Sequence, residues 1–200
     1  LWLLPEASLR LALVLATRTI YSLRVRGLEH VPEKGGALLA PNHVAMIDGL
    51  FLMAVIDRPI RFLVDREQYE KWWQKPFMKA LDAIPISARA GPREMLRALR
   101  DAGRHLEEGH LVCIFPEGQL TRNGMMQPFR RGVERIAKGR GAPIVPVCLG
   151  GVWGSVFSGS GGRFVWKLPE RVPYPVSLTF GDPLPETTSA PELRRVVADM

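Results

Sequence analysis

Cysteine and long apolar runs are the scarcest features of this sequence. Its 200 residues include two cysteines, Cys113 and Cys148, and both lie in apolar runs, where a free thiol behaves as a small core hydrophobe. A reducing, cytosolic setting is therefore favoured over a secreted one. No stretch approaches the roughly 20 apolar residues of a membrane-spanning helix. Arg10 and Arg18 interrupt the N-terminal apolar run, which also does not suit a signal peptide.

Signatures of several functional classes are also missing. The sequence has no GxSxG nucleophile elbow, and neither cysteine lies at a recognisable elbow, so no protein nucleophile is expected. His30, His105 and His110 show no ligand spacing with His43, which disfavours a metal site. Lys and Arg exceed Asp and Glu by 27 to 20, and this net charge of +7 indicates an anionic partner. Because zinc-finger spacing and RNP-like aromatic blocks are lacking, we do not expect nucleic acid.

Short apolar strands alternate with helices along the chain. The predicted strands cover residues 36–41, 60–64, 111–115, 144–149 and 176–180. The predicted helices cover residues 49–56, 91–109, 132–138 and 191–200. This alternation predicts an α/β fold with a mainly parallel sheet flanked by helices. At this length, with 46% hydrophobic residues, we expect one globular core.

The N-terminal segment, residues 1–26, is predicted to be an amphipathic helix in the lipid interface. It combines Leu, Val, Trp and Tyr with arginines at positions 10, 18, 24 and 26. An ordinary helix packed on the core suits the same composition equally well. Residues 27–200 are predicted to form the main domain, and we expect the sequence to be a piece of a longer polypeptide.

A first polar cluster, N-H-V-A-M-I-D, follows the predicted strand 36–41, where sites lie in open α/β sheets. On a regular helix His43 and Asp48 would point about 140° apart. If His43 stays in the turn and Asp48 opens the helix, the two side chains can converge. The carboxylate would then fix the imidazole tautomer and leave a base near neutral pH. Without a protein nucleophile, that base must activate a hydroxyl of the substrate.

A second polar cluster, F-P-E-G-Q-L-T-R-N-G at 115–124, follows the predicted strand 111–115. Its Gly-containing turn exposes backbone amides. Arg122, Arg130 and Arg131 offer guanidinium groups that suit a phosphate. A solvated basic loop is the alternative interpretation.

The two clusters together resemble the glycerolipid acyltransferase superfamily. The NHxxxxD block of that family matches Asn42, His43 and Asp48, the FPEG block matches 115–118, and a VPIVPV-type block is similar to A-P-I-V-P-V at 142–147. The resemblance implies transfer of a fatty acyl group from acyl-CoA or an acyl carrier protein to the free hydroxyl of a lysophospholipid or 1-acylglycerol-3-phosphate. It implies no bound cofactor and no metal.

The same resemblance implies a role for each site residue. His43 would be the general base and Asp48 its orienting partner. Many members have EGTRS where this chain has E-G-Q-L-T-R, and the Arg of an Ile-Asp-Arg block is displaced by one in I-S-A-R. Substrate contacts are implied for Asn42, Glu117, Gly118, Thr121, Arg122, Arg89 and Arg130.

These departures are similar to the acyltransferase domain of bacterial 2-acylglycerophosphoethanolamine acyltransferase/acyl-carrier-protein synthetase proteins. In those proteins the domain is fused to an acyl-activating domain and sometimes to a lysophospholipid transporter. The resemblance implies a larger acceptor headgroup and attachment, peripheral or through a fused domain, at the cytoplasmic face of the bacterial inner membrane. A catalytically silent lipid-binding or scaffold domain is the alternative, and the intact His43 and Asp48 argue against it.

Overall fold

The centre of the molecule is a seven-stranded sheet with the order β1-β7-β6-β2-β5-β3-β4. The computed structural model describes residues 3–72, 74–87, 89, 91–160 and 172–200. Only β6 and β7 pair antiparallel, and the other neighbouring strands pair parallel, which confirms the predicted mainly parallel sheet. The strands are β1 Tyr21–Arg26, β2 Ala37–Pro41, β3 Ile60–Asp65, β4 Ile84–Ile86, β5 Leu111–Cys113, β6 Ile144–Gly150 and β7 Tyr174–Phe180.

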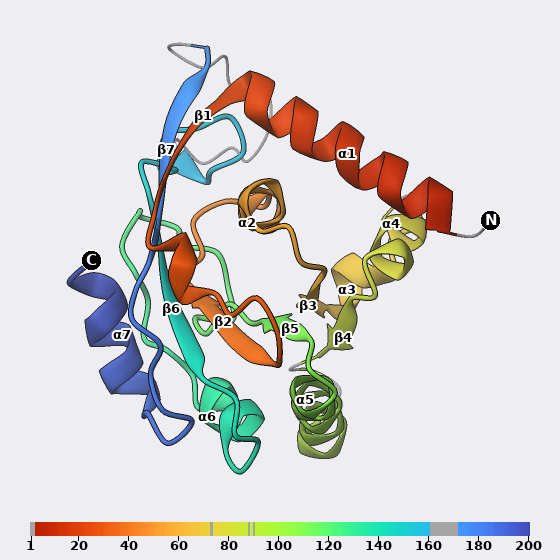
Figure 1. The fold of residues 1–200 in the computed structure, drawn as a ribbon, viewed down its shortest axis with the longest axis vertical. Coiled ribbons are helices and arrows are strands. Elements are labelled where there is room, and N and C mark those ends of the chain that lie inside the picture. The colour runs from red at the N-terminus through yellow and green to blue at the C-terminus, as the bar shows by residue number, and fades with distance from the viewer. Residues whose placement is uncertain (1–2, 73, 88, 90, 161–171) are drawn as a thin grey trace.

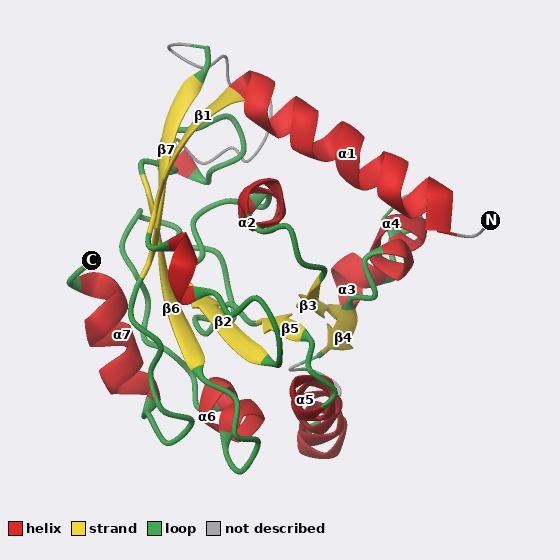
Figure 2. Cartoon of the chain, viewed as in Figure 1, coloured by secondary structure: helices red, strands yellow, loops and turns green. Residues whose placement is uncertain are grey.

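Helices cover both faces of this sheet, as the alternating pattern predicts. Figures 1 and 2 show α1 and α2 on one side, and α5, α6 and α7 on the other. The helices are α1 Leu3–Ile20, η1 Leu28–His30, α2 Asp48–Val55, α3 Arg66–Tyr69, α4 Lys75–Ala80, α5 Pro92–Glu107, α6 Gly132–Ala137 and α7 Ala190–Ala198. Within the described ranges, no helix is long and apolar enough to cross a membrane.

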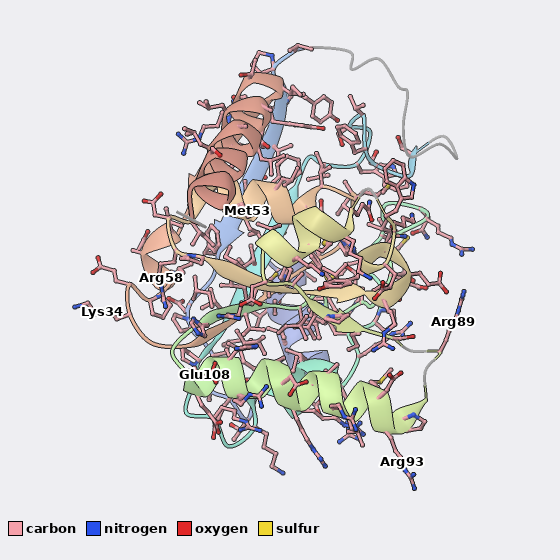
Figure 3. The ribbon with its side chains drawn as sticks, turned by 90° about the vertical axis from the view of Figure 1, so that its right-hand side faces the viewer. Lys34, Met53, Arg58, Arg89, Arg93 and Glu108 are labelled. Atoms are coloured by element: carbon pink, nitrogen blue, oxygen red, sulfur yellow. The ribbon has the colours of Figure 1, made fainter. Side chains whose placement is uncertain are left out.

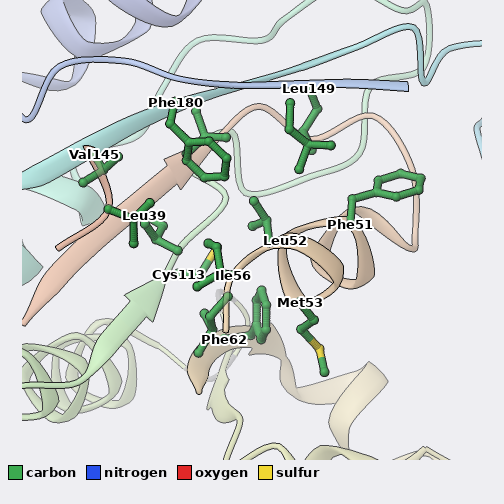
Figure 4. Packing of buried hydrophobic residues seen from close by; sticks show 14 of the residues in the cluster. Leu39, Phe51, Leu52, Met53, Ile56, Phe62, Cys113, Val145, Leu149 and Phe180 are labelled. Carbon is green, nitrogen blue, oxygen red and sulfur yellow. The ribbon is translucent and has the colours of Figure 1, made fainter. Parts of the chain in front are cut away.

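Each face of the sheet has its own hydrophobic core because side chains alternate along a strand. In β2, Ala37 and Leu39 pack towards α2, whereas Leu38 and Ala40 pack towards α5, α6 and α7. Figure 4 shows side chains of this first core, with Leu39 from β2 and Leu52 from α2 among them. All five residues of β2 are buried, so this central strand is fixed from both sides.

The prediction of one helix over residues 1–26 is wrong at its C-terminal end. Helix α1 ends at Ile20, and the next six residues form β1, which pairs with β7. Tyr21, Leu23 and Val25 alternate with polar residues, a pattern with a period of two that suits a strand. Burial of the Tyr21 ring, which is 2% exposed, ties this strand to the core. Arg24 and Arg26 therefore lie on an edge strand instead of a helix.

Close contact between β2 and α5 depends on Gly36, which precedes β2. A Cβ atom at this position would lie 2.0 Å from the carbonyl oxygen of Leu106. Because backbone would have to move, we expect Gly36→Ala to lower the free energy of unfolding by at least about 2 kcal/mol. Urea denaturation monitored by circular dichroism measures this change.

Gly132→Ala is the matched control for that experiment. The nearest atoms to a Cβ there are side-chain carbons at 3.6 and 3.7 Å, and alanine favours a helix. Its free energy of unfolding should stay within about 1 kcal/mol of the parent. Equal losses for the two variants would contradict this account of the β2–α5 contact.

Candidate active site

The two polar clusters predicted from the sequence meet at the carboxyl ends of the strands, which form one edge of the sheet. Strand β2 leads into the turn 42–47, and its parallel neighbour β5 leads into the loop 114–131. Since carboxyl ends of adjacent parallel strands share an edge, the two segments lie side by side. The backbone N–H of Thr121 donates to the carbonyl oxygen of His43 at 3.1 Å, which joins them directly.

His43 and Asp48 converge as predicted. His43 stays in the turn, Asp48 is the first residue of α2, and His43 Nδ1 lies 3.0 Å from Asp48 Oδ2. The same oxygen accepts hydrogen bonds from the backbone N–H groups of Val44 at 2.6 Å and Ala45 at 2.9 Å. Because a carboxylate only accepts, the Nδ1 position carries the proton, and Nε2 keeps its lone pair.

Phe115 holds the imidazole from its other side. The rings of His43 and Phe115 stack with centroids 4.0 Å apart and planes inclined by 22°. The His43 side chain is 20% exposed, whereas the Asp48 side chain is fully buried. The imidazole is thus held on two sides and remains partly exposed. The FPEG block predicted Phe115 to lie near the site but not this stacking.

Glu117 bridges the two segments of the site. Its Oε1 accepts from the backbone N–H of His43 at 2.7 Å, and its Oε2 accepts from the backbone N–H of Gln127 at 2.7 Å. The residue is 2% exposed. Burial raises the pKa of this carboxyl above its usual value, although the two backbone hydrogen bonds act in the opposite direction. Both oxygens are engaged in holding the site, and the predicted contact of Glu117 with substrate stays a prediction.

Asn42 also has its polar atoms engaged by the backbone. Its Oδ1 accepts from the N–H of Leu149 at 2.7 Å, and its Nδ2 donates to the carbonyl oxygen of Leu149 at 3.2 Å. The residue is 7% exposed, and its two hydrogen bonds connect the turn to β6 inside the protein. A direct contact of Asn42 with substrate also stays a prediction.

Gly118 and Arg130 lie against each other beside Glu117. Gly118 has a φ of 67°, and a Cβ there would lie 2.9 Å from Arg130 Nε. Arg130 donates its backbone N–H to the carbonyl oxygen of Pro116 at 2.8 Å. The absence of a side chain at Gly118 therefore lets the Arg130 guanidinium lie over the turn.

The remaining predicted residues occupy different positions in this loop and beyond it. Thr121 is buried, and its hydroxyl lies 2.8 Å from the carbonyl oxygen of Met125. Arg122 is exposed, and in the described part of the chain its guanidinium has no ion-pair partner. Arg89 follows β4, two strands beyond β5 at the same edge, and pairs with Glu67. Figure 3 shows Arg89 projecting from the molecule, so its side chain belongs to the surface.

Buried polar atoms behind Asp48 were not found from the sequence. Asp48 Oδ1, Tyr21 Oη and Ser155 Oγ are buried without a hydrogen-bond partner among the described residues. Burial raises the pKa of the Tyr21 phenol to about 12, against a smaller lowering by the Ser155 side chain, and the Asp48 charge adds to the rise. Tyr21 and Ser155 carry no motif, and only the tertiary fold brings Tyr21 within electrostatic range of Asp48.

One group of metal-ligand types lies outside this site. Ligand atoms of His105, Glu108 and His110 fall within 4.8 Å of one another at the amino end of β5, opposite the edge that carries His43. Arg61 Nη2 lies 3.3 Å from His110 Nε2. Burial lowers the pKa of His110, and the charge of Arg61 lowers it further. The positive charge of the neighbouring Arg61 guanidinium opposes the binding of a cation at that position.

The part of the chain that resembles known proteins contains both polar clusters of the site. The Acyltransferase family model matches residues 22–150. Over 135 residues, the chain is 29% identical to a probable 1-acyl-sn-glycerol-3-phosphate acyltransferase of Mycoplasma pneumoniae, covering 65% of this chain and 50% of that protein. Over 134 residues, it is 32% identical to the 1-acyl-sn-glycerol-3-phosphate acyltransferase of Pseudomonas aeruginosa, covering 66% and 51%. The chain therefore spans about half the length of these curated relatives.

A solved structure has the same fold. The crystal structure of the 1-acyl-sn-glycerophosphate acyltransferase of Thermotoga maritima matches 97% of this chain and 77% of its own, with a TM-score of 0.73 and 21% identity. At this identity, the similarity shows that the two chains share a fold.

The raised pKa of Glu117 predicts a pH dependence of stability. The folded state binds this proton more tightly than the unfolded chain, whose Glu has the ordinary pKa of 4.5. The free energy of unfolding of the parent should therefore fall, relative to Glu117→Gln, as the pH rises above that value, and level off above the raised pKa. Urea denaturation of both proteins across this range measures the difference.

Glu186→Gln provides a control of opposite sign. Backbone N–H groups of Gly141 and Arg140 lower the pKa of Glu186, so its contribution to stability is present above the ordinary value and lost below it. The parent should gain stability relative to Glu186→Gln as the pH rises. A Glu117→Gln variant with the same pH profile as the parent would show that burial does not raise the Glu117 pKa.

Proposed function

The chain belongs to the Acyltransferase family, and from that premise we propose that it transfers a fatty acyl group from a thioester donor to the free hydroxyl of a lysophospholipid or 1-acylglycerol-3-phosphate. The observation that carries the proposal is the His43–Asp48 pair. Its Nδ1–Oδ2 contact of 3.0 Å leaves Nε2 as a base in a half-buried position. The relatives from Mycoplasma and Pseudomonas are named for a glycerolipid acceptor, which supports this substrate class.

The chemical step needs only the acceptor, the donor and this pair. His43 Nε2 accepts the proton of the acceptor hydroxyl while the oxygen attacks the thioester carbonyl carbon. When the tetrahedral intermediate collapses, the carbon–sulfur bond breaks, and the departing thiolate takes the proton from the imidazolium. The products are an ester and a free thiol. Asp48 holds the ring in the reactive tautomer and stabilises the imidazolium.

The two cysteines are unsuited to a covalent intermediate. Cys113 is fully buried, and burial raises the pKa of its thiol well above the usual value, with a further rise from the Asp48 charge. Burial also raises the pKa of Cys148. Since the thiolate is the nucleophile, neither residue competes with the acceptor hydroxyl. Direct transfer between donor and acceptor follows.

Arginines around the site supply the charge for an anionic headgroup. Arg130 lies over the Gly118 turn, and Arg122 is exposed in the same loop. Arg89 lies three strand positions from β2, about 14 Å away at a strand spacing of about 4.8 Å. Arg122 and Arg130 therefore suit the acceptor phosphate, and Arg89 suits the outer part of a larger headgroup.

Helix α1 supplies a surface for peripheral membrane attachment. Leu11 and Leu15 are 59% and 57% exposed on its outer face, one helical turn apart. The helix is anchored on α2, since Arg18 Nη2 donates to the carbonyl oxygen of Ala54 at 2.8 Å, and the buried Thr17 marks its inner face. The domain would act at the cytoplasmic face of a bacterial inner membrane. The resemblance to the fusion proteins supports a further acyl-activating or transporter domain as a tether.

The role of the dyad predicts the activity of two variants. His43→Ala should lower the turnover number by about 10³-fold or more, because it removes the base. Asp48→Asn should lower it by about 10²-fold, because the neutral amide stabilises the imidazolium less. Initial rates with a lysophospholipid and acyl-CoA measure both effects, with His105→Ala as a control histidine outside the site.

A thermal melt of each variant separates loss of chemistry from loss of fold. His43→Ala should melt within a few degrees of the parent because the imidazole is partly exposed. Transfer within about tenfold of the parent by folded His43→Ala would exclude His43 as the base.

The proposed reaction is tested by its products. The parent protein is incubated with a panel of lysophospholipids and 1-acylglycerol-3-phosphate, each with acyl-CoA and with an acyl carrier protein thioester. We expect a diacyl product with at least one pair, identified by mass spectrometry, because the base and the anion-binding arginines lie at one edge of the sheet. Absence of a product with every pair would favour the silent lipid-binding domain instead.

The exposed leucines predict how the domain binds vesicles. Burying a leucine contributes about 2 kcal/mol, so Leu11→Ser with Leu15→Ser should weaken co-sedimentation with anionic vesicles by at least about tenfold. Val25→Ser with Val172→Ser removes exposed apolar surface elsewhere and should leave binding unchanged. Higher salt should weaken binding of the parent. Equal binding by the α1 variant and the parent would contradict attachment through α1.

A further inference from the structure

Four arginines form one stripe on the outer face of α5. Residues 93, 97, 100 and 104 recur at intervals of three and four, which places them within an arc of about 60° at about 100° per residue. All four are exposed, whereas Leu99, Ala102 and Leu106 on the opposite face are buried in the core. Figure 3 shows Arg93 projecting from α5 away from the sheet.

Arg140 extends this stripe from the segment after α6. Its guanidinium lies against α5 at Gly103, where a Cβ would lie 2.9 Å from Arg140 Nε and 3.2 Å from Cζ. Gly103 thus makes room for a fifth arginine beside the other four. We call these five residues the arginine stripe. Together with Leu96, Asp101 and Glu107 they line a groove of about 550 Å³.

The stripe has more positive charge than its neighbours neutralise. Arg104 pairs with Asp101 at 3.1 Å, and Arg140 pairs with Glu107. Across the described ranges, no ion pair engages Arg93, Arg97 or Arg100. These three charges span about 10 Å of helix at 1.5 Å per residue. A row of this length suits an elongated acidic surface better than a single phosphate group.

The surroundings of the stripe distinguish a protein from a bilayer or a nucleic acid. Among the described residues of α5 and Arg140, none is an exposed large hydrophobic, whereas such residues mark α1 on the opposite side of the sheet. An interfacial membrane site combines basic residues with apolar anchors. The groove is also lined without aromatic side chains, which single-stranded nucleic acid uses for stacking.

The stripe begins at the edge of the sheet that carries the dyad. Helix α5 follows the carboxyl end of β4 and runs back to the amino end of β5, so Arg93 lies near the active edge and Arg104 near the opposite one. A partner bound along α5 therefore has one end beside the site. A thioester on a long prosthetic arm could reach His43 from there, while α1 stays free on the other face.

We propose that the arginine stripe of α5 is the docking surface for an acidic helix of an acyl carrier protein, which delivers the acyl thioester to His43. The inference rests on the proposed function and goes beyond it by assigning the protein-bound donor to a specific surface. Acyl-CoA has no acidic helix, so its use does not depend on the stripe.

Charge reversal within the stripe tests this assignment. Initial rates are measured for the parent and for Arg97→Glu with Arg100→Glu, using the same acyl chain on an acyl carrier protein and on CoA. We expect kcat/KM for the carrier-protein donor to fall at least tenfold and for acyl-CoA to change less than twofold. Arg26→Glu with Arg195→Glu makes the same change in net charge elsewhere and should leave both donors unaffected.

Binding and salt dependence provide readouts besides turnover. Calorimetry with the carrier protein lacking its acyl chain should show binding to the parent and weaker binding to the stripe variant. Rising salt should reduce kcat/KM for the carrier-protein donor more steeply in the parent than in the variant. A thermal melt of the variant that matches the parent confirms that the fold is kept.

The outcomes separate the docking surface from the proposed function. An unchanged carrier-protein reaction in the stripe variant, or an equal loss with both donors, would overturn the assignment. A parent that uses acyl-CoA but not the carrier-protein donor would overturn the assignment and leave the acyltransferase function standing. A parent that uses neither donor would overturn both.

Discussion

The buried Asp48 carboxylate is the interaction on which the rest of the site depends. A charged group without exposed surface is costly unless donors surround it. Here one oxygen accepts from the His43 ring and from the backbone N–H groups of Val44 and Ala45, at the first turn of α2. The N-terminal end of a helix also favours a negative charge. The interaction that closes the turn is therefore the one that orients the His43 imidazole, so folding and the geometry of the site have a common cause.

A second buried acid, Glu117, connects the two loop segments that form the site. Glu117 connects the His43 backbone to the Gln127 backbone, and Asn42 connects the same turn to β6. These residues use their polar atoms on the backbone, whereas Arg122 and Arg130 keep theirs at the surface. The motif residues thus divide into buried ones that fix geometry and exposed ones that are available to an anionic substrate. A motif residue can therefore contribute to the site through its hydrogen bonds to the backbone.

Local patterns predicted most of the sheet because the strands are short, apolar and bounded by Gly or Pro. The strand around Leu39, the helix starting at Pro92 and the turn containing His43 all follow from residues close in sequence. The sequence predicts a helix for residues 21–26 because the preceding apolar helix hides the change of period at Tyr21. The antiparallel pairing of β6 with β7 could not be predicted, since no local pattern sets strand direction across a long connection. The partners of Asn42 and Glu117 were missed for the same reason: they depend on contacts between distant segments.

The two faces of the sheet present different surfaces to the surroundings. Exposed leucines lie on α1, on one side, and the arginine stripe lies on α5, on the other. An acceptor lipid and a water-soluble donor differ in the same way, since one is held in a bilayer and the other approaches from solution. The His43 site, at the carboxyl ends of the strands, lies between these two faces. Under the proposed function, the lipid would thus approach His43 from the α1 side of the three-layer fold and the donor from the α5 side, so neither would cross the path of the other.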